Sequence, residues 1–327
     1  MVTMLSTIAP MFVVILIGFA AGFVPRFRAA TSHLNGFLFY FGLPAFIYTA
    51  MVTAPPVDNF PLAALIIPVT VTPLLSVGLY YLFRAMGPKI RDGAAPSSLA
   101  GTFGNVGYFG IPISIGVIGP EAGLAAGVVH ILHNAIYMNG YPLVRTAVNT
   151  RSRQSSATQG FAAFWRFQLW PVLRRAVLLN PVFLAMLLAL ILVLADRRMP
   201  SLFDEPAGML GDTAVPLALF CVGLALHPAI EGIRSGGVPK APIAVGSAVK
   251  LLLLPLLTWA AVLPFYDHLG PVWVGTLIIL AATPSSTTVF LFSEEYDGDG
   301  RLAASILVVS TAFSLLTLPL VAEFMLH

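Results

Sequence analysis

The sequence predicts an all-α polytopic membrane protein with ten transmembrane helices, and three observations lead to that prediction. They are the composition, the spacing of the charges and an internal repeat. Of the 327 residues, 58% are hydrophobic and 9% are charged, against about 45–50% and about 25% in a typical soluble domain. This excess argues against an ordinary soluble domain, a disordered chain and a nucleic-acid-binding protein, because none of these has a core large enough to bury it.

The charged residues bound long apolar stretches. For example, 29 uncharged residues separate Arg28 from Asp58, and 26 separate Asp267 from Glu294. A helix needs about 20 apolar residues to cross the hydrocarbon core, whereas the strands of a membrane barrel give shorter, alternating runs. We therefore expect ten helices, at about 5–24, 32–53, 60–83, 97–118, 122–146, 176–195, 206–227, 241–264, 272–293 and 302–324.

The basic residues predict how the chain is oriented. No Lys or Arg precedes the first apolar stretch, while Arg26 and Arg28 follow it. This argues against a removable signal peptide and places residue 1 outside. With ten alternating spans, 14 of the 17 Lys and Arg residues fall in inside loops, two fall outside and one, Lys250, lies within a span. We expect an integral membrane protein with both termini outside.

The two halves of the chain resemble each other around their prolines. Pro112 and Pro284 lie 172 residues apart, a second proline pair has the same separation, and YPLV at 141–144 matches LPLV at 318–321 at a separation of 177. Five spans in each half insert the second half upside down, and such inverted repeats are typical of secondary transporters. The predicted organisation is a first five-helix inverted repeat at 1–149, a cytoplasmic linker at 150–173 and a second five-helix inverted repeat at 174–327.

Spans four and nine contain helix-breaking motifs, GNVGYFGIP at 104–112 and AATPSSTT at 281–288. Glycine and proline destabilise a helix interior, so these breaks should be buried in protein or line a cavity. Where two broken helices cross, their N-termini present free amides that favour anions. The alternative is that these small residues only permit close helix packing. The residues expected at the substrate site are Asn105, Gly107, Tyr108, Gly110, Pro112, Thr283, Pro284, Ser285, Ser286 and Thr287.

Span five carries a polar stripe on one helical face, formed by His130, His133, Asn134, Tyr137 and Tyr141. An ionisable residue inside a membrane suggests function, and a His pair suggests a proton pathway. A structural hydrogen-bonding face is the alternative, and a metal site has little support because two ligands are too few. The corresponding face of span ten is uncharged and consists of Ser310, Ser314 and Thr317.

Two charges lie within spans, Asp212 and Lys250. Lys250 meets the negative charge of a substrate, pairs with Asp212 or extends towards the membrane surface. We add His133, Asn134, Lys250 and Asp212 to the candidate transport residues. Glu294 and Glu295, at the inside end of span nine, either bind a coupling cation or are solvated boundary charges. We expect no metal and no cofactor, with coupling to H⁺ or Na⁺ as the open question.

Several of these segments resemble the auxin efflux carrier family, which belongs to a larger group that includes the bile acid sodium symporters. The similar segments are 37–51, 104–119, 211–226, 250–257 and 280–299, in the same order and over essentially the whole chain. The resemblance implies two inverted repeats with crossovers in helices four and nine, and elevator-like alternating access. It also implies a homodimer and organic-anion substrates, with malate, malonate or similar acids for members of the bacterial inner (plasma) membrane.

We therefore expect a secondary active transporter for a small organic anion, such as a malate- or malonate-like or an auxin-like mono- or dicarboxylate, with the lipid bilayer as its surroundings and no nucleic-acid partner. A channel or a membrane receptor of the same fold is the alternative. An intramembrane enzyme would use Ser285 or Ser286 with His130 or His133. However, no GxSxG-type motif surrounds these serines, and we expect no enzymatic activity.

Overall fold

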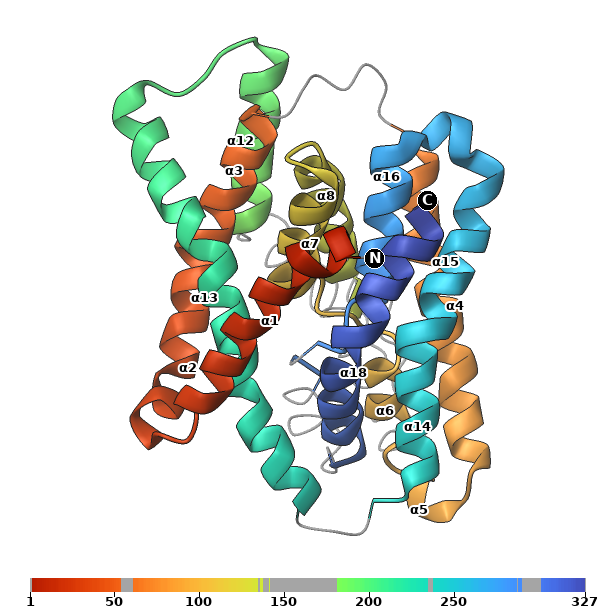
Figure 1. The fold of residues 1–327 in the computed structure, drawn as a ribbon. Coiled ribbons are helices and arrows are strands. Elements are labelled where there is room, and N and C mark those ends of the chain that lie inside the picture. The colour runs from red at the N-terminus through yellow and green to blue at the C-terminus, as the bar shows by residue number, and fades with distance from the viewer. Residues whose placement is uncertain are drawn as a thin grey trace, which may run out of the picture.

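The computed structural model describes residues 2–53, 61–134, 136–137, 141, 181–234, 238–286, 288–289 and 301–326. In these residues the chain is helical apart from short connections and one isolated β-bridge (Figure 1). The predicted linker at 150–173, Thr287, Glu294 and Glu295 lie outside the described residues.

Each of the ten ranges predicted from the sequence overlaps at least one helix of the described residues. In chain order the elements are α1 (Val2–Ala21), α2 (Pro25–Phe37), the π-helical turn η1 (Leu38–Gly42), α3 (Leu43–Thr53), α4 (Ala63–Ala85), α5 (Pro88–Arg91), α6 (Ala94–Ala100), the π-helical turn η2 (Val106–Gly110), α7 (Ile111–Ile118), α8 (Ala122–Asn134), α12 (Pro181–Leu194), α13 (Ser201–Arg234), α14 (Lys240–Ala248), the π-helical turn η6 (Val249–Leu253), α15 (Leu254–Val262), the 3₁₀ turn η7 (Leu263–Phe265), α16 (Tyr266–Ala282) and α18 (Arg301–Leu326).

The length and composition of the helices identify an integral membrane protein. Five segments among the described residues are long and apolar enough to cross a membrane: Pro25–Thr53, Ala63–Ala85, Ser201–His227, Lys240–Ala282 and Arg301–Met325. The segment Lys240–Ala282 has 43 residues, about twice what one crossing needs. It bends at Gly270, whose φ of +71° is left-handed, so that α15 and α16 pack against each other. The number of crossings and the inverted repeat stay predictions.

The helices form two groups (Figure 1). In the first group α1 packs against α13, and α3 packs against α12 and α13. In the second group α4 packs against α6 and α15, and α18 packs against α14, α16 and α6. Each group therefore combines elements from both halves of the chain. The interrupted helices α6–α7 and α16 belong to the second group, together with η2 and α8, which pack against them; η1, which packs against α2, α3 and α13, belongs to the first.

Two glycines allow α1 and α13 to approach closely in the first group. A Cβ atom on Gly18 would collide with the backbone carbonyl of Phe220, and one on Gly223 would collide with that of Ile15. Small residues at helix interfaces allow this kind of backbone contact in membranes. The α1–α13 pair is therefore held by backbone shape, and any larger side chain at these positions has to separate the helices.

We expect Gly223→Ala to destabilise the protein by roughly 1–3 kcal/mol, the usual range for overpacking. The measurement is the thermal unfolding midpoint in detergent. Gly78→Ala in α4 is the matched control, because nothing lies within 4 Å of the position that its Cβ would take. Equal midpoints for the two variants would show that the close contact does not limit stability.

Candidate functional site

The two interrupted helices meet at a single point in the second group. The first interruption covers residues 101–105, between α6 and η2, and the second follows the end of α16 at Ala282. Gly104 and Ser285 form an antiparallel β-bridge. The Asn105 amide donates to the Pro284 carbonyl at 2.8 Å, and the Ser286 amide donates to the Phe103 carbonyl at 2.9 Å. The backbone groups freed by one break therefore pair with those freed by the other.

The first interruption lies earlier than its motif suggests. Residues 106–118 are helical, and Pro112 lies in the first turn of α7, directly after the π-helical turn η2. A π turn changes the hydrogen-bond pattern locally, which suits a residue that lacks an N–H. Pro284, in contrast, lies in the extended segment. The two prolines are therefore not structurally equivalent, although both motifs contain one.

Gly107 and Gly110 also lie in the helical turn η2 rather than in the break. Their lack of a side chain provides space. A Cβ on Gly107 would lie 2.6 Å from His130 Cε1, and a Cβ on Gly110 would lie 2.5 Å from Leu280 Cδ2. These glycines allow η2 to pack closely against α8 and α16.

Each extended segment is also fixed by a side chain from a neighbouring helix. The Gly104 amide donates to His133 Nε2 at 3.2 Å, and the Ser285 amide donates to Ser310 Oγ at 3.1 Å. His133 lies on α8 and Ser310 on α18, 177 residues later, which is the separation that relates 141–144 to 318–321. The polar faces of spans five and ten therefore perform the same task with an imidazole and a hydroxyl group.

Asn105 caps the helix that begins after the first break. Its side-chain oxygen accepts a hydrogen bond from the Tyr108 amide at 3.3 Å, as expected for an N-cap residue. The amides of Val106 and Gly107 precede the first intrahelical bond and have no acceptor within the described part of the chain. Among the described residues, this helix start therefore presents N–H groups without an acceptor.

These amides lie beside a cavity, which we call the crossover cavity. Phe39 and Leu43 line it from the first helix group, and the remaining lining residues come from the second. Asn134 Nδ2 lies 3.0 Å from His130 Nε2 at its edge. The polar side chains that line it are Asn105, Tyr108, His130, Asn134, Ser286 and Thr288.

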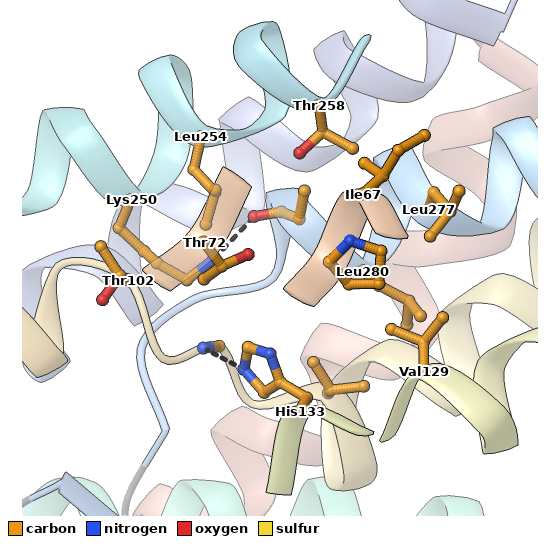
Figure 2. A pocket seen from close by; sticks show the side chains of 14 residues that line it. Ile67, Thr72, Thr102, Val129, His133, Lys250, Leu254, Thr258, Leu277 and Leu280 are labelled. Carbon is orange, nitrogen blue, oxygen red and sulfur yellow. Dashed lines mark hydrogen bonds between the residues drawn. The ribbon is translucent and has the colours of Figure 1, made fainter. Parts of the chain in front are cut away.

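A second cavity is lined by Gly104 and by residues of α4, α15 and α16, and we call it the lysine cavity (Figure 2). Lys250 is fully buried there, and its Nζ donates to the Ala281 carbonyl at 2.6 Å. Gly104 lines both cavities. The polar side chains of the lysine cavity are Thr72, Thr102, His133, Lys250 and Thr258.

The structure separates two residues that the sequence suggested as a pair. Asp212 is exposed on α13, in the first helix group, whereas Lys250 is buried in the second. Among the described residues, Asp212 and Lys250 do not form an ion pair with each other. Lys250 also lies apart from the crossover cavity, so it does not line the same space as Asn105 and Tyr108.

The serines and histidines do not form a nucleophile–base pair in the described part of the chain. His133 Nε2 accepts the Gly104 amide, and the buried Ser285 Oγ has no hydrogen-bond partner there. Sequence reasoning missed the lining threonines Thr72, Thr102 and Thr258. Isolated threonines in apolar segments carry little signal, because their hydroxyls can bond a carbonyl of the preceding turn, as that of Thr102 does with the Ser98 carbonyl of α6.

Comparison with known proteins gives one family and three relatives. The model of the family described as "Membrane transport protein" matches residues 3–322. The chain is 26% identical over 323 residues to a Rhizobium meliloti protein named "Putative malonate transporter", covering 95% of this chain and 92% of the relative. It is 24% identical to uncharacterized transporters of Methanothermobacter thermautotrophicus (96% of each chain) and Methanocaldococcus jannaschii (88% of this chain, 87% of the relative).

We expect Ser310→Ala to lower stability by about 1–3 kcal/mol, because it leaves the buried Ser285 amide without an acceptor. Ser314→Ala is the matched control, since among the described residues that hydroxyl bonds only the Thr311 carbonyl of its own helix. Thermal unfolding of both variants in detergent provides the comparison. The prediction fails if Ser310→Ala is no less stable than Ser314→Ala.

Proposed function

Because the chain belongs to the membrane transport protein family, which confirms its resemblance to the auxin efflux carriers, we propose that it is a secondary active transporter for a small organic anion. The substrate is a mono- or dicarboxylate that binds in the crossover cavity and moves by an elevator-type mechanism. The observation that carries this proposal is the bridge between Gly104 and Ser285, which brings two helix interruptions together inside an apolar protein.

The chemistry of the crossover cavity favours a carboxylate. The free amides at the start of η2 and the positive end of its dipole attract an anion. Asn105 holds these amides in place, and Tyr108, Asn134 and Ser286 supply polar groups around them. No acidic side chain lines this cavity among the described residues. The name of the Rhizobium meliloti relative supports malonate as the first compound to test.

The two helix groups support the elevator mechanism. Phe39 and Leu43, which face the cavity from the first group, are apolar, and the polar lining residues come from the second group. The extended segments and their acceptors on α8 and α18 also belong to the second group. The second group can therefore slide along the first as a unit without breaking the hydrogen bonds that build the site.

The direct test is uptake of radiolabelled malonate, malate and auxin by proteoliposomes that contain the purified protein. A carrier shows saturable uptake and counterflow against unlabelled substrate, whereas a channel conducts without counterflow. A protein that binds these acids but does not move them would be a receptor. If none of the three acids is bound or transported, the proposed substrate class is wrong.

A charge placed at Asn105 tests the location of the site. Asn105→Asp keeps an acceptor for the Tyr108 amide but adds a negative charge beside the anion, so we expect the apparent affinity for malonate to fall by at least about tenfold. Asn105→Ser keeps a neutral cap and is the matched control. The apparent affinity is obtained from initial uptake rates at different malonate concentrations. Similar affinities for the two variants would place the anion elsewhere.

A further inference from the structure

The lysine cavity contains the side chain of Lys250, and binding of an anion in the crossover cavity does not require a lysine at this position. Lys250 is fully buried, and the Ala281 carbonyl is its hydrogen-bond partner among the described residues. None of the described residues that line this cavity is acidic. A buried ammonium group is costly unless it is paired and hydrogen-bonded, so its charge calls for a further partner.

The end of α16 provides part of the compensation. Ala281 lies in the last turn of that helix, where unpaired carbonyl groups carry a partial negative charge equivalent to roughly half an electron. This partial negative charge stabilises the protonated form of Lys250, but it does not fully balance the positive charge of the ammonium group. This position therefore accommodates either a neutral amine or a charged ammonium group, and a nearby anion decides between them.

An anion in the crossover cavity is close enough to Lys250 to favour its charged form. Gly104 lines both cavities, and a Cβ on Gly104 would lie 3.2 Å from Lys250 Nζ. Lys250 thus lies beside backbone that also lines the crossover cavity. For unit charges on the order of 8 Å apart and an effective dielectric constant near 20, the attraction changes an equilibrium roughly thirtyfold.

The other ionisable groups around Lys250 are less suited to bind a proton. His133 is the second titratable residue of the lysine cavity, but its Nε2 already accepts the Gly104 amide. The helices α4, α15 and α16 contribute apolar residues and threonines to the cavity, without a titratable group. Helices α14 and α18 also pack against η6, and their described ionisable residues lie near the helix ends: Lys240, Arg301 and Glu323.

We propose that Lys250 carries a proton across the membrane together with the anion. The neutral amine takes up one proton when the anion enters the crossover cavity, and the ammonium group releases that proton when the anion leaves on the other side. Each cycle moves one proton with one substrate molecule. Because coupling is reciprocal, a bound proton also strengthens anion binding by the same factor. This inference rests on the proposed transport function.

The experiment measures proton uptake on binding. Malonate is titrated calorimetrically into the detergent-purified protein in buffers of different ionisation enthalpy, which gives the number of protons taken up per bound anion. We expect about one for the wild type and none for Lys250→Met or Lys250→Arg. Lys250→Met should bind malonate roughly thirtyfold more weakly, whereas Lys250→Arg keeps the charge and should bind it well.

Proteoliposomes provide the second readout. Both lysine variants should lose malonate accumulation driven by a pH gradient, while Lys250→Arg should retain malonate counterflow, which needs no net proton movement. His133→Gln, which keeps an acceptor for the Gly104 amide, should retain proton uptake. If Lys250→Met does not fold, Lys250→Arg decides the question.

Three results separate the possible failures. A wild type that neither binds nor transports malonate, malate or auxin defeats the proposed function, and the proton-carrying role falls with it. A wild type that transports one of these acids with buffer-independent binding heat, or with a requirement for sodium in place of a pH gradient, defeats only the role of Lys250. Loss of proton uptake in His133→Gln but not in Lys250→Arg transfers the role to the histidine.

Discussion

The backbone pairing between Gly104 and Ser285 is the interaction on which the rest of the site depends. An extended segment inside a membrane protein exposes N–H and C=O groups that neither lipid nor a regular helix can satisfy. Here each break satisfies the other through the bridge and its two neighbouring hydrogen bonds. Neither interruption is tolerable alone, so the crossing point is fixed by the need of both segments for partners.

The glycines around this point determine which side chains come close to it. Gly107 makes room for His130, and Gly104 makes room for Thr283 and Lys250. A polar helix start and a buried amine thereby both lie close to the backbone of Gly104. In our proposal, an anion in the crossover cavity and a proton in the lysine cavity stabilise each other across this backbone.

Much of the architecture follows from the sequence, because the apolar stretches and their spacing report directly on the membrane. The meeting of the two breaks was also predictable, since both motifs contain residues that disfavour a helix. The position of the first break was not predictable from the sequence. Glycines that permit an extended chain and glycines that permit close packing look alike in sequence, and of the three glycines in the motif at 104–112 only Gly104 lies in the break. Similarly, periodicity places Lys250 within a helix but does not tell which helix faces it, so its separation from Asp212 required the fold.

The long separation between the two bridged residues also affects how the protein is made. Gly104 and Ser285 are 181 residues apart in the chain, so a ribosome adding about 5–20 residues per second needs on the order of 10–40 s to synthesise the second after the first. During this interval the first interrupted helix has no partner strand. The nascent first half must therefore wait near the translocation machinery, or in contact with water, until the rest of the chain arrives.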